Sequence, residues 1–329
     1  VLLRGGTDTD APFQMKGLEA HLDSLAAHGG NYVRNTMAYS RPEDVWPFQQ
    51  NADGKFDLSQ PNPAFFQRLE RLLQMAYERD IIVQIEVWAT WNYYAPGGEG
   101  YPKRGWNVSP FNPLNNVNYT LAETGLPDSI DYIKSEYPGE HTFFYTRPSE
   151  EDVPEVRKYQ ELFVDRLLEV ALAYPNVLYC MNNETNEAHS WGQYWAEYIR
   201  TQAGERGLEV ETGDMYDVNA LTHPRHRRIV DDPAYTFVDV SQNNFNLRES
   251  HFEFVRYLRD YSAAHEPKPV NNTKIYGGSW GYDPGDAEEG AARYLRNLFA
   301  GAASMRFHRR SADPYAETQE NYYALGQGI

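Results

Sequence analysis

Residues 81–88 read "IIVQIEVW" and residues 176–182 read "NVLYCMN". Both are nearly continuous apolar runs, too short for most helices and rich in β-branched or aromatic side chains. Strands of a parallel sheet are covered on both faces, so they lack the alternation of apolar and polar residues seen in half-exposed strands. These two runs therefore predict a parallel sheet with helices on its outside.

Six further runs of this kind occur along the chain, and helical segments separate most of them. Residues 62–80, for example, place Leu69, Leu72, Leu73 and Ala76 on one face at helical spacing. No glycine-rich phosphate turn follows the first run, which argues against an open doubly wound sheet. Eight strands alternating with helices predict an α/β fold, a (β/α)₈ TIM barrel. The eight predicted strands are Leu2–Gly6, Tyr32–Met37, Ile81–Trp88, Val177–Asn182, Leu208–Glu211, Thr236–Ser241, Pro269–Tyr276 and Ala302–His308.

We expect residues 1–329 to form one barrel domain with a long insertion at about 92–154. That stretch has no clear period and is rich in Tyr, Pro, Asn and Gly, which suits a large loop after the third strand. The segment "HPRHRR" at 223–228 is interpreted as a loop. Few residues remain after "SMRFHRR" at 304–310 to build a closing helix. We therefore expect the natural chain to continue past residue 329, into a further domain.

The composition narrows the class of partner. The formal net charge of −17 disfavours nucleic acid, whose binding needs a basic surface. No apolar stretch is long enough to span a membrane, and the single cysteine, Cys180, excludes an internal disulfide and is expected in the core. The 25 tyrosines and 7 tryptophans suit a protein that grips sugars with aromatic faces. We expect a carbohydrate partner and a secreted or periplasmic protein, and leave the oligomeric state open.

Polar side chains gather where the predicted strands end. In a (β/α)₈ barrel these carboxyl ends meet on one face, where active sites lie. The sequence shows neither zinc-ligand spacing nor a nucleophile elbow, so we predict no metal and no cofactor. Trp91 and Trp106 are further candidate stacking platforms. The predicted catalytic residues are Glu184, Asp214 and Asp239. The predicted substrate-binding residues are Arg34, Trp88, Asn183, Glu187, Gln242, Asn243, Lys274, Tyr276, Trp280 and His308.

Two of these strand ends carry a family resemblance. "VLYCMNNE" ends its fourth strand with Asn-Glu, and "YVRNTM" places an Arg on the second. Both resemble the clan of barrel-fold retaining glycoside hydrolases that includes cellulases, mannanases and β-galactosidases. The resemblance implies that Glu184 is the general acid/base, that Asn183 contacts the sugar, and that Arg34 supports the nucleophile. A structural ion pair of Arg34 with Glu86 or Glu184 is the alternative.

The seventh predicted strand departs from that clan. Its members carry a nucleophilic Glu there, whereas this chain reads "KPVNNTKIYGG" with Lys274 at the expected position. Four interpretations stay open: a different carboxylate (Asp214, Asp239 or Glu187), Tyr276 as nucleophile, a shifted alignment, or a barrel that binds glycans without cleaving them.

The hypothesis favoured by these observations is a glycoside hydrolase that uses Glu184. Lys274 raises the option of an anionic glycan such as a uronate, because an ammonium group pairs with carboxylates. The alternatives are a non-catalytic glycan-binding barrel and a polysaccharide lyase in which Lys274 or Tyr276 abstracts a proton.

Overall fold

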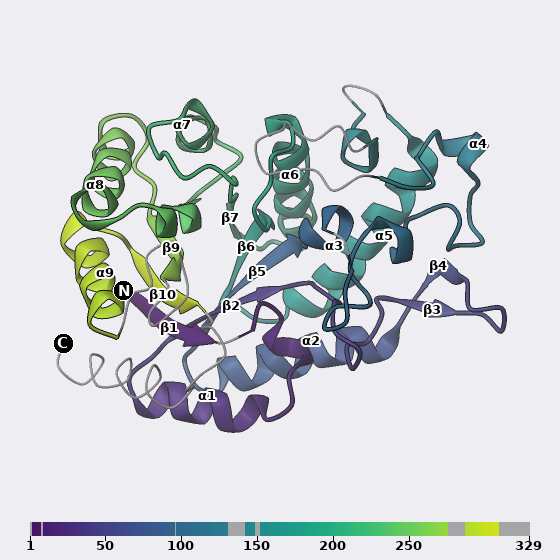
Figure 1. The fold of residues 1–329 in the computed structure, drawn as a ribbon, viewed down its shortest axis with the longest axis horizontal. Helices are drawn as coiled ribbons and strands as arrows, with labels where there is room; N and C mark the ends of the chain where they lie inside the picture. Colours follow the sequence, from purple (N-terminus) through teal and green to yellow (C-terminus); the bar gives the residue numbers. More distant parts are fainter. Residues whose placement is uncertain are drawn as a thin grey trace.

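Among the residues that the structure describes, eight parallel strands form the centre of the molecule (Figure 1). The computed structural model describes residues 2–7, 9–95, 97–130, 142–148, 152–275 and 287–308. The strands pair in the order β7-β6-β5-β2-β1-β10-β9-β8. Their bounds are β1 Leu3–Thr7, β2 Tyr32–Thr36, β5 Ile82–Trp88, β6 Val177–Asn182, β7 Glu211–Gly213, β8 Val238–Asp239, β9 Val270–Ile275 and β10 Ser304–His308.

The sheet closes between β7 and β8. A parallel bridge joins Met215 to Asp239, and the Thr236 amide donates to the Thr212 carbonyl at 2.7 Å. The result is a nearly closed (β/α)₈ barrel, as the sequence predicts. Gly5 on β1 shows how tightly neighbouring strands approach, because a Cβ at this position would lie 1.7 Å from the Tyr32 carbonyl oxygen.

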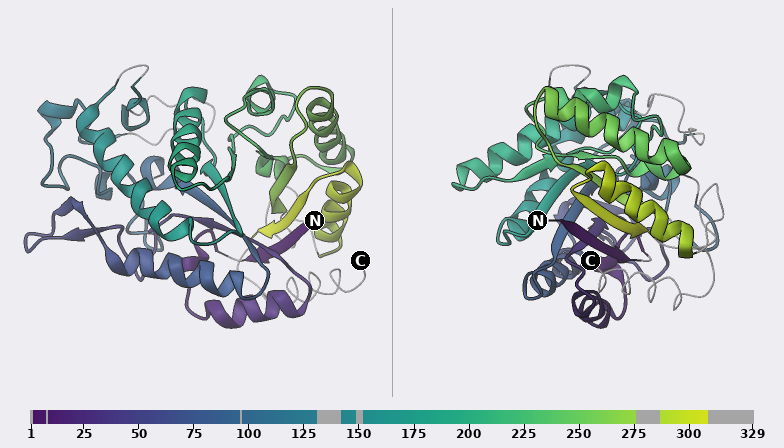
Figure 2. Two further views of the ribbon diagram at one scale, coloured as in Figure 1. Left: turned by 180° about the vertical axis from the view of Figure 1, so that it is seen from behind. Right: turned by 90° about the vertical axis from the view of Figure 1, so that its left-hand side faces the viewer.

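Helices pack around the outside of the strands (Figure 1, Figure 2). Contacts join α1 to α2, α2 to α5, α5 to α6, α7 to α8 and α8 to α9, so neighbours in the ring follow chain order. Helix α2 shows why the sequence folds this way: Asn62 caps it by accepting from the Ala64 amide, Pro63 opens it, and its apolar face is buried. The bounds are α1 Leu18–Ala27, α2 Pro63–Tyr77, α5 Pro154–Ala171, α6 His189–Glu205, α7 Pro224–Asp231, α8 Arg248–Ala264 and α9 Ala287–Ala300.

Two sequence interpretations need correction. The predicted strand Leu208–Glu211 is wrong over most of its length: Gly207 ends α6 with a φ of 71°, Leu208 is 41% exposed, and β7 begins only at Glu211. Residues 223–228 do not form a loop: they are the N-cap and the first turns of helix α7. There His223 caps the helix, and the face carrying His226, Ile229 and Val230 is buried.

Short elements fill the connections on the carboxyl side. The hairpin of β3 and β4 follows β2 and was not predicted from the sequence. The predicted insertion after β5 holds α3, η2, α4 and η3, and its Phe111 packs edge-on against Phe48 of β3 at 5.5 Å between ring centroids. The bounds are η1 Pro12–Gln14, β3 Phe48–Gln50, β4 Phe56–Pro61, α3 Trp91–Tyr94, η2 Trp106–Val108, α4 Leu121–Thr124, η3 Thr142–Tyr145 and η4 Ser241–Phe245.

Within the described residues, no helix is both long enough and apolar enough to cross a membrane.

Candidate active site

A cavity of about 670 Å³ opens at the carboxyl ends of the barrel strands. Segments that follow β1, β2, β5, β6, β7 and β8 contribute to its wall, together with Lys274 of β9. The wall combines aromatic rings, amides, cations and carboxylates. Its main polar and aromatic residues are Asp10, Gln14, Lys16, Arg41, Glu43, Asp44, Trp91, Asn92, Tyr101, Arg104, Asn183, Glu184, Asp217, Gln242, Asn244, Phe245 and Lys274.

Glu184 lies in this wall, two residues past the end of β6, and its side chain is 14% exposed. Its backbone adopts a φ of 55°, a left-handed conformation that costs free energy for a residue with a side chain. Hydrogen bonds hold both neighbours: the Asn183 amide donates to the Trp88 carbonyl at 3.0 Å, and the Thr185 amide to the Met215 carbonyl at 3.0 Å. The barrel therefore fixes the turn that presents Glu184.

Two donors from the described residues contact the Glu184 carboxylate. Lys274 Nζ forms an ion pair with Oε1, and the Trp91 indole donates to Oε2. Lys274 is only 2% exposed and comes from the seventh strand of the barrel, β9. An adjacent ammonium group favours the ionised form of a carboxylate. The ion pair therefore places an N–H donor of Lys274 directly beside the Glu184 carboxylate.

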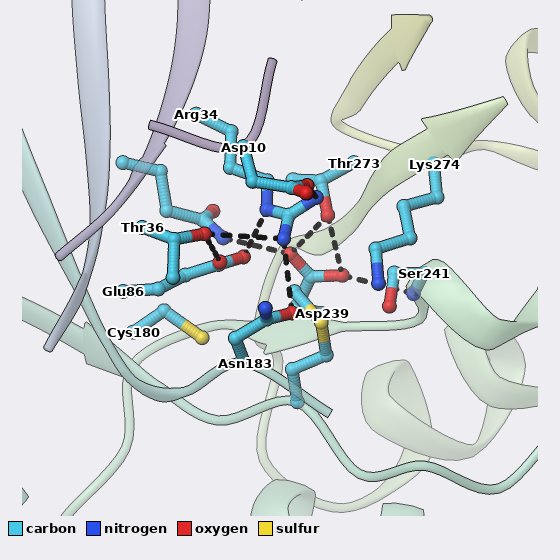
Figure 3. Close-up of polar contacts among 12 residues, drawn as sticks. Asp10, Arg34, Thr36, Glu86, Cys180, Asn183, Asp239, Ser241, Thr273 and Lys274 are labelled. Atoms are coloured by element: carbon cyan, nitrogen blue, oxygen red, sulfur yellow. Dashed lines mark hydrogen bonds and ion pairs between the residues drawn. The ribbon is translucent and has the colours of Figure 1, made fainter. Parts of the chain in front are cut away.

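Arg34 of β2 contacts residues at or just after the ends of several barrel strands (Figure 3). Its Nε pairs with buried Glu86, its Nη2 donates to Asn183 Oδ1 at 2.9 Å, and its Nη1 lies 3.5 Å from Asp10 Oδ1. Burial opposes the charge, but Glu86 and Asp10 outweigh it and raise the pKa of Arg34 above its usual value. Of the two ion-pair partners suggested by the sequence, the structure pairs Arg34 with Glu86.

His308 lies at the end of β10, beside the same arginine. Its Nδ1 faces Arg306 Nη1 at 3.1 Å and Arg34 Nη1 at 3.5 Å, while its Nε2 is 3.4 Å from Asp10 Oδ1. Guanidinium groups only donate hydrogen bonds, so Nδ1 is the acceptor and the ring proton is on Nε2. His308 therefore directs an N–H at Asp10.

Asp214 and Asp239, the two other predicted catalytic residues, lie inside the barrel rather than in the cavity wall. Asp239 accepts from Gln84 at 2.7 Å and from Thr273 at 2.8 Å (Figure 3). Asp214 accepts from Asn182 at 2.9 Å. Burial raises the pKa of Asp214 to about 6 and that of Asp239 to about 7.

The other predicted binding residues divide between cavity and interior. Asn183, Gln242 and Lys274 line the cavity. Trp88 is fully buried among aromatic rings that include Trp195, whose centroid lies 5.0 Å away. It is therefore a core residue. Asn243 is also buried and donates to the His251 carbonyl at 3.0 Å. Tyr276 and Trp280 lie outside the described residues.

Glu187 is buried, and neither carboxylate oxygen has a hydrogen-bond partner in the described part of the chain. Burial raises its pKa well above the usual value, and Arg225 opposes this rise. Glu187 is not part of the cavity wall, so the structure does not bring it together with Glu184.

The described residues contain no group of three or more His, Cys, Asp or Glu side chains that could hold a metal ion. Asp10 was not among the site residues predicted from the sequence, although "GGTDTD" at 5–10 places two acids directly after the first strand.

Comparisons with known proteins support the fold. Neither a protein-family model nor a curated protein sequence matches the chain. Among solved structures, an endo-1,4-β-mannanase from Rhizomucor miehei superposes with a TM-score of 0.62 at 12% identity, over 100% of this chain and 95% of that chain. This chain shares the barrel fold of a glycoside hydrolase. A glycoside hydrolase family 5 mannosidase from the same organism gives 0.60 at 13% identity, covering 100% and 94%. An endo-1,4-β-D-mannanase from Thermotoga petrophila gives 0.61 at 9%, covering 100% and 99%.

Proposed function

We propose that this chain is a glycoside hydrolase that binds a glycan in the cavity and uses Glu184 as its general acid/base. The observation that carries the proposal is the placement of Glu184: a strained, fixed turn at the end of β6 holds its carboxylate in the cavity wall. Such strain often marks a functional position.

The cavity wall suits a carbohydrate. Trp91, Tyr101 and Phe245 offer aromatic surface for the apolar faces of sugar rings, and Asn183 and Gln242 offer amides for hydroxyl groups. The mannanases with this fold make β-1,4-mannan the first substrate to test. The same wall contains the cations Lys16, Arg41 and Arg104, so an anionic glycan is the second substrate to test.

The ion pair between Lys274 and Glu184 supplies the proton for this chemistry. A sugar that displaces water lowers the local dielectric and favours two neutral groups over two charges, so the proton passes from Lys274 Nζ to Glu184. Glu184 then gives it to the glycosidic oxygen as the bond to the anomeric carbon breaks. In the second half, Glu184 takes a proton from the attacking water and returns it to Lys274.

Release of reducing ends tests the proposal. We expect the wild-type chain to cleave at least one of β-1,4-mannan, β-1,4-glucan, xylan and polygalacturonate, and Glu184→Gln to reduce the rate about 10²- to 10⁴-fold. Glu253→Gln, an exposed change on α8, is the matched control and should leave the rate unchanged. Equal rates for Glu184→Gln and the wild type would remove Glu184 from the mechanism. Formation of an unsaturated uronate would indicate the lyase instead.

A non-catalytic glycan-binding barrel is the second candidate, and the same ion pair favours it. The ammonium group of Lys274, which pairs with Glu184, cannot accept a hydrogen bond. It can donate hydrogen bonds to the hydroxyl oxygens of a bound sugar. Calorimetric titration with mannohexaose separates the two candidates, since binding without any release of reducing ends supports this one.

A further inference from the structure

Hydrolysis of a glycoside by acid and base groups normally needs two carboxylates on opposite sides of the scissile bond. This inference rests on the proposed function, which assigns the first carboxylate to Glu184, and it concerns the identity of the second. The buried acids Glu86, Asp214 and Asp239 are each 1% exposed or less and do not line the cavity. Within the part of the chain that the structure describes, the acids in the wall besides Glu184 are Asp10, Glu43, Asp44 and Asp217.

Asp10 differs from the other three in what holds it. It follows β1, and its Oδ1 contacts Arg34 of β2 and His308 of β10 at 3.5 and 3.4 Å. Groups on two barrel strands therefore fix its position while its side chain stays 29% exposed. Glu43 is exposed. Asp44 accepts from the Arg41 amide in its own loop, and Asp217 accepts from Asn186 at 3.3 Å.

Arg34 also connects Asp10 to the residue next to Glu184. One guanidinium reaches Asp10 through Nη1 and Asn183 through Nη2. Because these two nitrogens belong to one rigid planar group, Asp10 is fixed relative to the strand end that presents Glu184.

We propose that Asp10 is the second carboxylate of the site and acts as the nucleophile. The arginine and the histidine N–H favour its ionised form, which makes it a weak base but a suitable nucleophile and leaving group. A group that activates water, by contrast, needs a proton affinity matched to the working pH.

The reaction balances with groups of this chain and one water. An oxygen of Asp10 bonds to the anomeric carbon while the glycosidic bond breaks, and the departing oxygen takes the proton from Glu184. Water then attacks the same carbon and gives a proton to Glu184, and the ester bond to Asp10 breaks to restore the carboxylate. Two inversions at the anomeric carbon retain its configuration.

His308 is a positioning residue in this scheme. Its Nε2–H orients Asp10, while Nδ1 is occupied by Arg306 and Arg34. His308→Gln should therefore lower kcat with little change in KM, whereas Asp10 variants should abolish the covalent step.

Trapping of the covalent intermediate tests the proposal. A 2-deoxy-2-fluoro-β-D-mannosyl fluoride, or its glucosyl epimer, has a leaving group that needs no proton and should accumulate as an ester on the full chain. Trypsin releases Asp10 in the peptide of residues 5–16, and fragmentation separates a label on Asp10 from one on Asp8. We expect the label on Asp10, and retention of anomeric configuration by nuclear magnetic resonance.

The variants supply the second readout. Asp10→Ala and the shape-conserving Asp10→Asn should each reduce the rate about 10³-fold or more, and added azide should restore turnover of Asp10→Ala as a glycosyl azide. Asp53→Ala, in the turn between β3 and β4, is the matched control and should keep full activity. Melting temperatures show that each variant is folded.

The outcomes separate the two proposals. A wild type that cleaves glycans while a folded Asp10→Asn keeps more than a tenth of the rate, a label on another residue, or inversion of configuration each overturns the role of Asp10 alone. A wild type that cleaves none of the glycans and takes up no label overturns the hydrolase, and the role of Asp10 with it.

Discussion

Two layers of acidic groups lie at the carboxyl end of the barrel, and they differ in access to the cavity. The interior acids Glu86, Asp214 and Asp239 are buried and bonded by donors from neighbouring strands. The rim acids Asp10 and Glu184 stand in the cavity wall with 29% and 14% of their side chains exposed. A buried carboxyl without such donors is costly, and among the described residues Glu187 is in that position. We therefore expect substitutions in the interior layer to lower stability and substitutions in the rim layer to lower activity.

The largest effect on stability should come from the interior pair of Glu86 and Arg34, both with fully buried side chains. Glu86→Ala leaves the guanidinium short of a partner and should lower the free energy of unfolding by about 3–5 kcal/mol. Glu253→Ala, which breaks an exposed pair with Arg256, should cost less than about 1 kcal/mol. Urea denaturation measures both changes. Similar losses in the two variants would mean that burial does not determine how much these ion pairs contribute to the free energy of unfolding.

Replacement of Asp239 should have a smaller effect on stability, and that effect should depend on pH. Its pKa rises from 3.8 to about 7 on folding because the carboxyl is buried. The unfolded chain loses this proton near pH 4 and the folded chain only near pH 7, so the stability that Asp239 contributes falls as pH rises between those values. Asp239→Asn cannot titrate, so the wild type should lose stability relative to this variant by about 1 kcal/mol or more over that window.

Thermal unfolding of both proteins from pH 4 to pH 8 measures this difference. Asp260→Asn, whose parent side chain is 59% exposed on α8, is the control and should show no such trend. A gap between wild type and Asp239→Asn that stays constant with pH would contradict the assignment.

The sequence predicted the interior of the barrel better than its rim. The run Val177–Asn182 became β6 with the same bounds because a strand buried on both faces must be apolar throughout. The strands β7 and β8 were harder to predict, because they have only three and two residues. Closure of the barrel, which depends on residues far apart in the sequence, holds them in place. The hairpin of β3 and β4 was missed for a similar reason: its residues Gln49 and Gln50 carry no apolar pattern.

The candidate site shows the same limit. Glu184 was predicted from a local pattern, Asn-Glu after a buried strand. Its ion pair with Lys274 joins residues 90 positions apart in the sequence, and only the closed barrel brings them together. Asp10 was missed because its contacts with Arg34 and His308 form only in the closed barrel. Trp88 was assigned to the cavity because strand position does not reveal which aromatic rings surround a tryptophan.

The last prediction concerns activity and Trp91, which lies in the rim and donates its indole N–H to Glu184. Trp91→Phe keeps an aromatic face for a sugar but removes this donor. A hydrogen bond to a charged group contributes about 1.5–3 kcal/mol, so kcat/KM should fall roughly 10- to 100-fold. The free energy of unfolding should change little, because the ring is only partly buried.

Trp106→Phe is the matched control, because it also removes an indole donor, here to the Pro127 carbonyl and from a buried ring. It should lower stability and leave kcat/KM near the wild-type value. A Trp91→Phe protein that loses stability but keeps its activity would place Trp91 with the interior layer and blur the division between the two.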